Sequence, residues 1–203
     1  MSKKLARVDR FEYSALILAG GQGQRMGGQD KGWVRWRGKP LIEHALDRVR
    51  AQTVAPAEIL ISANRHLDEY AITGARVVQD LRAGFAGPLA GIEAGLRHAK
   101  SDWVLVTACD MPVIPLNLLE NLNSGLEHHD VAVATSSKKF SPLTILLSRF
   151  LVKSLTAYLD SGHAAVKPWL KSMDVAEVEF SDPQSFANIN SLKETHEHPT
   201  KRH

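Results

Sequence analysis

Runs of Val, Ile and Leu recur along the chain with the length and composition of buried β-strands. Each run is four to seven residues long and has Gly, Pro, Asp or Asn next to one of its ends, as expected for strands that are covered on both faces. Six strands are predicted on this basis, at Tyr13 to Ala19, Glu58 to Ala63, Ala75 to Val78, Trp103 to Ala108, Val131 to Thr135 and Leu143 to Leu147.

Between several of these runs, apolar residues recur at helical spacing instead. One face is formed by Leu41, Ile42, Ala45, Leu46 and Val49, and another by Leu89, Ile92, Leu96 and Ala99. Further helices are predicted at about Pro115 to Leu126 and Arg149 to Leu159, followed by a less regular C-terminal third. Alternation of strands and helices predicts an α/β fold of three layers, α/β/α, with a Rossmann-like, mostly parallel sheet.

Composition agrees with one ordinary globular domain. The chain has 203 residues, of which 44% are hydrophobic and 23% charged, and we expect a single domain over 1–203 with flexible ends at 1–10 and 194–203. The net charge of +3 comes from basic residues that are scattered, apart from clusters at the two ends. A nucleic-acid partner is therefore weakly supported and a small anionic substrate fits equally well; we expect no nucleic acid. Cys109 is the single cysteine, so no intramolecular disulfide is possible. We see no signal peptide and no membrane span, and expect a cytoplasmic monomer.

A glycine-rich segment directly follows the first predicted strand. Six of the fourteen glycines lie between Gly20 and Gly32, together with Arg25 and Lys31. Glycines let backbone N–H groups approach phosphate oxygens, and the two cations would add positive charge. The segment matches neither a P-loop nor the dinucleotide motif, because no Gly-Lys-Ser/Thr triplet occurs and Met26 occupies the third glycine position. The alternative interpretation is a plain surface connection.

Two acidic residues end predicted strands. Asp110 follows the most hydrophobic strand, and Asp80 follows the strand through Val78. The carboxyl ends of parallel strands form the active edge of an open α/β sheet, so both acids should face the edge that carries the glycine-rich segment. A carboxylate at that edge can hold Mg²⁺ together with substrate phosphates. Helix capping or a turn is the alternative role for either residue.

Other segments leave two interpretations open. Gly84 to Gly91 is a second glycine-punctuated loop, in which Pro88 suits a first helical turn; it could face an anion or be an ordinary turn. Asn188 and Asn190 could join a metal or substrate shell or merely satisfy a turn. Trp33 and Trp36 could stack on a ligand ring, but packing is favoured.

The motifs together resemble a known enzyme family. Leu18 to Gly32, followed by Gly38-Lys39-Pro40-Leu41, is similar to the signature of nucleotidyltransferases, and the run from Arg25 to Gly32 resembles their molybdenum cofactor guanylyltransferase branch. The resemblance continues through Ser62-Ala63-Asn64-Arg65-His66, Gln79-Asp80, Gly87-Pro88-Leu89-Ala90-Gly91, Cys109-Asp110 and Asn188-Ile189-Asn190.

That resemblance implies a fold of the nucleotidyltransferase type and a magnesium-dependent transfer of GMP from GTP to the phosphate of molybdopterin, with release of pyrophosphate. Arg25, Lys31 and Asp110 would be catalytic, and Asp110 would bind the metal. The implied nucleotide-binding residues are Leu18, Ala19, Gly20, Gly21, Lys31, Ser62, Asn64, Asp80, Gly87, Pro88, Leu89 and Asp110. Ser62 stands where the resembled enzymes often have Asn, and Ser141 departs from the His or Gln seen before their proline. Molybdoenzyme chaperones and other cofactor-biosynthesis proteins are the expected protein partners.

Rival functions stay open at this point. The same chemistry could serve a molybdopterin cytidylyltransferase or a sugar-phosphate nucleotidyltransferase, although Gly20-Gly21 favours GTP by resemblance. A rival of another class is a non-catalytic nucleotide-binding accessory protein.

Overall fold

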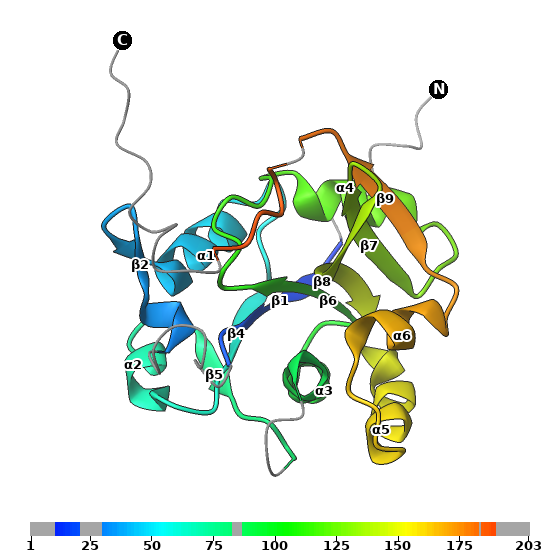
Figure 1. Ribbon diagram of the computed structural model, residues 1–203, viewed down its shortest axis with the longest axis horizontal. Coiled ribbons are helices and arrows are strands. Elements are labelled where there is room, and N and C mark those ends of the chain that lie inside the picture. Colours follow the sequence, from blue (N-terminus) through cyan, green and yellow to red (C-terminus); the bar gives the residue numbers. More distant parts are fainter. Residues whose placement is uncertain (1–10, 21–29, 83–86, 183, 190–203) are drawn as a thin grey trace.

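A seven-stranded sheet forms the centre of the molecule. The computed structural model describes residues 11–20, 30–82, 87–182 and 184–189 (Figure 1). The sheet has the strand order β5-β4-β1-β6-β8-β7-β9. Its strands are β1 (Tyr13–Leu18), β4 (Glu58–Ser62), β5 (Arg76–Val78), β6 (Trp103–Ala108), β7 (Val131–Ser136), β8 (Lys139–Ser148) and β9 (Ala176–Phe180). A separate two-stranded ribbon pairs β2 (Arg35–Trp36) with β3 (Lys39–Pro40).

The sheet is mostly parallel, as predicted. Strands β5, β4, β1 and β6 run in one direction, and β8 is antiparallel to both of its neighbours, β6 and β7. The β7–β8 hairpin turns through Ser137 and Lys138, which both have positive φ (50° and 60°). Such two-residue turns match the natural twist of paired strands.

Helices cover both faces of the sheet, which confirms the three-layer α/β/α prediction. Figure 1 shows α1 and α4 on one side and α3, α5 and α6 on the other. The helices are α1 (Leu41–Arg50), α2 (Leu67–Ala71), α3 (Pro88–His98), α4 (Leu118–Leu126), α5 (Val152–Asp160) and α6 (Val166–Lys171), with 3₁₀ turns η3 (Lys31–Trp33) and η4 (Arg149–Leu151).

The central strand β1 shows why the apolar runs are continuous. Tyr13, Ala15 and Ile17 pack with the helices α1 and α4, whereas Leu16 and Leu18 pack with α3 on the opposite face. Since successive side chains of a strand point to opposite faces, a strand between two helix layers needs apolar residues at nearly every position. Ser14 is the polar exception in β1, and its buried hydroxyl donates to Glu58 Oε1 at 2.8 Å.

The C-terminal third is more regular than the sequence indicated. The structure places α6 and the edge strand β9 there. In β9, Glu177 and Glu179 are exposed and alternate with less exposed apolar residues, so the strand lacks the continuous apolar run used to identify the others. Pro168 lies in the first turn of α6, where a helix does not need the missing N–H. Helix α4 begins at Leu118, three residues later than predicted.

The longest helix in the described ranges is α3, with 11 residues, and none of the described helices combines the length and the apolar character that crossing a bilayer requires.

Candidate functional site

A cavity of about 610 Å³ opens where the strand order reverses. After β1 the chain builds β4 and β5 on one side of it, then crosses to place β6 on the other side. In open α/β sheets this switch point, at the carboxyl ends of the strands, is where ligands bind. The described residues that line the cavity are Leu18, Ala19, Gly20, Lys31, Ser62, Asn64, Asp80, Gly87, Pro88, Gly91, Ala108, Cys109, Asp110 and Leu143.

Backbone hydrogen bonds fix the floor of the cavity. Leu18 is paired in register with Ser62 on one side and with Ala108 on the other. The Ser62 carbonyl accepts from the N–H groups of Ala19 and Gly20, both at 2.9 Å, and the Leu18 carbonyl accepts from the Cys109 N–H at 3.0 Å. Ala19 and Gly20 are therefore held against the end of β4, and Leu18 is held against the end of β6.

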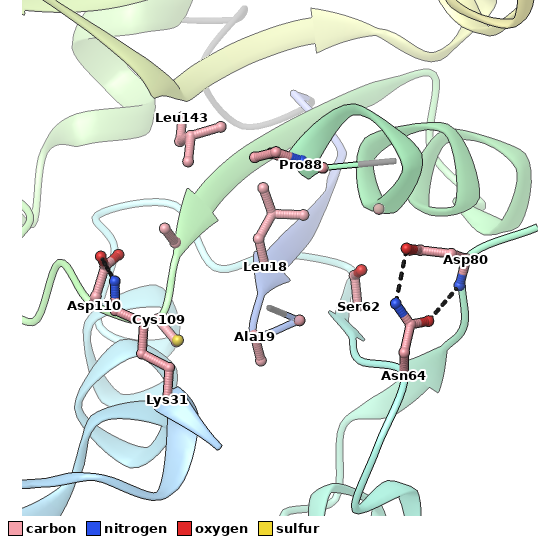
Figure 2. Close-up of a pocket in the computed structure, with 14 residues that line it drawn as sticks. Leu18, Ala19, Lys31, Ser62, Asn64, Asp80, Pro88, Cys109, Asp110 and Leu143 are labelled. Carbon is pink, nitrogen blue, oxygen red and sulfur yellow. Dashed lines mark hydrogen bonds and ion pairs between the residues drawn. The ribbon is translucent and has the colours of Figure 1, made fainter. Parts of the chain in front are cut away.

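At one end of the cavity, Lys31 and Asp110 form an ion pair between their Nζ and Oδ2 atoms (Figure 2). Asp110 follows β6, and only 9% of its side chain is exposed. Lys31 arrives from the 3₁₀ turn η3, 79 residues earlier in the chain, and 30% of its side chain is exposed. The buried carboxylate is thus neutralised by a cation that is itself accessible from the cavity.

This end of the cavity fits a divalent cation shared with a phosphate ligand. Within the described ranges there is no group of three His, Cys, Asp or Glu side chains that could hold a metal alone. Mg²⁺ commonly uses one or two protein carboxylates and takes its other ligands from substrate phosphates and water. Asp110 is such a carboxylate, so it suits Mg²⁺ when a phosphate ligand and water supply the remaining oxygen atoms.

At the other end, Asn64 and Asp80 hold each other by two hydrogen bonds (Figure 2). The Asn64 amide nitrogen donates to Asp80 Oδ2 at 2.8 Å, and the Asp80 backbone N–H donates to Asn64 Oδ1 at 2.9 Å. Burial raises the pKa of the Asp80 carboxyl, an effect that the hydrogen bond from Asn64 partly offsets. Asp80 is thus a preorganised acceptor that lacks a cationic partner among its hydrogen-bonding neighbours in the described residues.

The N-terminus of α3 forms one wall. Gly87 adopts φ of 73° and ψ of −169°, a conformation open to glycine, and Pro88 occupies the first helical turn. One turn later, a Cβ on Gly91 would lie 2.5 Å from Ser62 Oγ, so glycine allows the helix to approach β4 closely. Leu89 does not line the cavity, because its side chain is fully buried in the core beneath α3.

An ionic cluster around the buried Glu93 holds Arg82, two residues after Asp80. Arg82 donates from Nε to Glu93 Oε2 at 2.7 Å and from Nη1 to Asp160 Oδ1 at 2.7 Å. Glu93 lies on α3 and is 2% exposed, and its Oε1 also accepts from Thr156 Oγ1 at 2.6 Å. The cluster joins the segment after Asp80 to α3 and α5.

The structure brings together most residues that the sequence had selected. Ten of the twelve predicted nucleotide-binding residues line the cavity, namely Leu18, Ala19, Gly20, Lys31, Ser62, Asn64, Asp80, Gly87, Pro88 and Asp110. Of the remaining two, Leu89 is described by the structure but does not line the cavity, and Gly21 lies outside the described residues. Arg25, 83–86 and Asn190 also lie outside the described residues.

Four residues of the cavity wall have no site role in the sequence analysis. Gly91 belongs to a loop motif, Ala108 and Leu143 belong to predicted strands, and Cys109 is the single cysteine; all four line the cavity. The glycines at 87 and 91 are four residues apart, which is one helical turn, and this spacing was the available signal for Gly91. Cys109 is 1% exposed, and burial raises the pKa of its thiol, so it remains a neutral wall group.

A smaller cavity of about 230 Å³ lies beside the first and shares Leu143 with it. Its lining includes Met111, Phe140, Ser141, Phe186 and Asn188. The Ile189 N–H donates to the Asp110 carbonyl at 2.9 Å, so the segment with Asn188 is held against the end of β6.

The packing interpretation of the two tryptophans is confirmed. The ring of Trp33 lies 5.2 Å from that of Tyr70, centroid to centroid, and Trp36 is buried with Val34 and Leu41.

Comparison with known proteins gives the family of the chain. The family model of the MobA-like NTP transferase domain matches residues 15–178. A protein from Cupriavidus metallidurans named molybdenum cofactor guanylyltransferase is 39% identical over 96% of this chain and 98% of its own length, and one of the same name from Shewanella putrefaciens is 40% identical over 89% and 92%. A molybdopterin-guanine dinucleotide biosynthesis protein A from Archaeoglobus fulgidus shares the fold, with a TM-score of 0.72 and 24% identity over 90% of this chain and 94% of its own. The chain therefore belongs to the molybdenum cofactor guanylyltransferase family of the MobA-like NTP transferases.

Proposed function

We propose that this protein transfers GMP from GTP to the phosphate of molybdopterin and releases pyrophosphate, with Mg²⁺ as its cofactor. The observation that carries the proposal is the arrangement in one cavity of a lysine–carboxylate pair at one end and, at the other, the half-buried carboxylate of Asp80, which has no cationic hydrogen-bonding partner among the described residues. Family membership supports the same reaction, since relatives named for it match nearly the whole chain.

Asp80 and its surroundings suit a guanine base. The edge of guanine presents two neighbouring donors, N1–H and the N2 amino group, and a carboxylate presents two acceptors. The hydrogen bonds with Asn64 fix the position of Asp80 before a ligand arrives. Cytosine lacks this pair of adjacent donors, so Asp80 favours GTP over CTP.

The Lys31 end suits the phosphates. Lys31 is the one cationic side chain among the described residues that line the cavity, against the two carboxylates of Asp80 and Asp110. A triphosphate adds several negative charges, so it needs further positive charge in order to bind. We assign that charge to Mg²⁺ on Asp110 and to Arg25, which lies outside the described residues, with the loop N–H groups binding phosphate oxygens.

Positioning and charge neutralisation account for the proposed chemistry. The molybdopterin phosphate attacks the α-phosphorus of GTP, a bond to the new phosphate oxygen forms, and the bond to the departing pyrophosphate breaks. Lys31 stabilises the negative charge that develops on the pyrophosphate, and bound Mg²⁺ supplies further charge neutralisation. No protein nucleophile is required, because the molybdopterin phosphate itself attacks. Burial raises the pKa of the Cys109 thiol in the cavity wall.

The acceptor would approach through the smaller cavity. That cavity adjoins the Asp110 end and shares Leu143 with the larger one, so a molecule bound in it can direct a phosphate towards the nucleotide. Phe140 and Phe186 offer ring surfaces to a pterin, and Asn188 offers an amide.

We also propose a single-domain, monomeric enzyme of the cytoplasm that passes its product to molybdoenzyme chaperones and does not bind nucleic acid or membranes. One seven-stranded sheet takes its strands from Tyr13 through Phe180, which supports the single domain. The single, buried cysteine suits a reducing compartment.

The test is pyrophosphate release by the purified protein with molybdopterin, Mg²⁺ and either GTP or CTP. We expect release with GTP and loss of at least about 10³-fold in kcat for Asp110→Ala, since metal binding and transition-state stabilisation both depend on this carboxylate. Asp102→Ala is the matched control, because Asp102 precedes β6 as Asp110 follows it, and its side chain is 63% exposed in an ion pair with Arg149.

Release with CTP and not with GTP would overturn the assignment of guanine. Near wild-type activity of Asp110→Ala would overturn the metal site, and nucleotide binding without any pyrophosphate release would favour an accessory protein.

A further inference from the structure

The turn that carries Lys31 is stabilised from within by Asp30. Asp30 caps the 3₁₀ turn η3: its Oδ1 accepts the Gly32 N–H at 3.0 Å, and its carbonyl accepts the Trp33 N–H at 3.1 Å. A turn of three residues has few internal hydrogen bonds, so its position depends on what holds it from outside.

Tyr70 of helix α2 provides that outside contact. Its hydroxyl donates to Asp30 Oδ1 at 2.5 Å, so the oxygen that caps Gly32 also accepts from a residue 40 positions away. The Tyr70 side chain is fully buried, and its ring packs against Trp33. Burial and the bond to Asp30 raise the pKa of the hydroxyl, which keeps it a donor.

Gly32 shows how closely the two elements approach. A Cβ at this position would lie 2.2 Å from the Tyr70 hydroxyl oxygen, a separation that atoms cannot adopt. The glycine next to Lys31 therefore makes room for the tyrosine. The backbone φ of Gly32 is not positive, so the turn conformation does not require glycine here. The close approach of Tyr70 does.

The contact also joins the two ends of the cavity. Helix α2 begins at Leu67, three residues after Asn64, which holds Asp80 at one end. Asp30 immediately precedes Lys31, which pairs with Asp110 at the other end. A single hydrogen bond between Tyr70 and Asp30 thus connects the segment of the base site to the turn of the phosphate site.

We propose that Tyr70 is a positioning residue for Lys31, which it acts on through Asp30 and the turn η3; this inference rests on the proposed function. When phosphates reach the Asp110 end, the Lys31 ammonium has to move from Asp110 towards them. Because Tyr70 holds the backbone of the turn, only the Lys31 side chain has to move. Its ammonium then reaches the departing pyrophosphate without any rearrangement of the turn itself.

The test compares Tyr70→Phe with Tyr13→Phe. Both changes remove one hydroxyl from a fully buried tyrosine and keep the ring, because Tyr13 donates to the Val54 carbonyl at 2.8 Å within the core. We expect Tyr70→Phe to lower kcat about tenfold with KM for GTP changed less than about twofold, since small displacements of a catalytic group act on the transition state. Tyr13→Phe should leave kcat within about twofold.

A second pair of variants separates positioning from a general loss of structure. In a Lys31→Ala background, Tyr70→Phe should cause no further loss of kcat, because the group that it positions is gone. The same loss in both backgrounds, or an equal loss for Tyr13→Phe, would overturn the proposal.

Hydrogen exchange tests the contact without activity. Tyr70→Phe should accelerate exchange of the Gly32 amide and Tyr13→Phe should not, and an unchanged Gly32 amide would overturn the proposal. Should the wild type release no pyrophosphate from GTP and molybdopterin, the proposed function fails, while the exchange result still decides whether Tyr70 holds the turn.

Discussion

Substitution of Glu93 should clearly lower the stability of the fold, because Glu93 is a nearly inaccessible carboxylate that accepts four hydrogen bonds. Oε2 accepts from Arg82 Nε at 2.7 Å, and Oε1 accepts from Arg82 Nη2, Arg97 Nη2 and Thr156 Oγ1 at 3.1, 3.4 and 2.6 Å. Glu93→Gln preserves the volume, but it removes the charge and turns an NH₂ group towards one set of donors. Hydrogen bonds to a charged group contribute roughly 1.5–3 kcal/mol, so we expect the Glu93 change to lower the free energy of unfolding by about 2–3 kcal/mol.

Urea denaturation followed by circular dichroism measures this loss. For a chain of this size, about 2–4 °C per kcal/mol converts the loss to a decrease in Tm of about 4–12 °C. Asp160→Asn is the matched control: it removes a charge from the same cluster, also 2.7 Å from an Arg82 nitrogen, but Asp160 is 62% exposed. Exposed ion pairs contribute little, so this variant should lose clearly less. Equal losses in the two variants would refute the argument from burial.

The effect of Glu93 should also depend on pH. Burial alone raises the pKa of Glu93, but hydrogen bonds from Arg82 and Thr156 outweigh it, and the pKa in the folded protein is lower than the ordinary value of 4.5. The unfolded chain therefore binds this proton more readily, so the stabilisation is present above the ordinary value and is lost as the pH falls through the folded pKa. The stability difference between the wild type and Glu93→Gln should be constant near neutral pH and shrink in acid; a difference that grows in acid would contradict the assignment.

Two further outcomes follow from the cavity. Burial raises the pKa of Asp80 above 3.8, and donors from guanine would favour its ionised form, so GTP affinity should increase as the pH rises through the raised pKa and then level off. GTP affinity is measured by fluorescence titration at each pH for the wild type and for Asp80→Asn. Protonation of GTP affects both proteins equally, so identical pH profiles of affinity would exclude Asp80 from the base site. Cys109 is 1% exposed with a raised thiol pKa, so iodoacetamide should label it rapidly only in urea, and rapid labelling of the folded protein would contradict its burial.

Residues that act through backbone position were the most predictable from sequence. A strand between two helix layers must be apolar at nearly every position, which makes β1 and β6 evident from the sequence. Topology alone then assigns the residues at their carboxyl ends to one edge of the sheet. Asp110 and Gly20 follow from this argument without any knowledge of side-chain contacts. Their place in one cavity is confirmed.

Contacts between distant side chains were not predictable in the same way. The bond between Tyr70 and Asp30 joins positions 40 residues apart, and nothing in the spacing of either residue indicates it. Glu93 stands on a helix face among apolar residues, where sequence shows a charged residue but not the arginine that neutralises it, eleven positions earlier in the chain. Both contacts depend on how α2 and α3 settle against the sheet, which single-sequence periodicity does not specify.

The two cavities belong to different halves of the sheet. The parallel strands β5, β4, β1 and β6 end at the larger cavity, whereas the residues of the smaller cavity come mainly from β8 and the segment after β9. Because β8 runs antiparallel to β6, its beginning rather than its end lies beside Asp110, and this brings Ser141 and Leu143 next to the proposed acceptor. The two departures from the family pattern then fall in different halves: Ser62 borders the larger cavity and Ser141 borders the smaller one. On the proposed function, an altered contact at Ser62 bears on GTP and one at Ser141 bears on the pterin, so neither departure needs a compensating change in the other half.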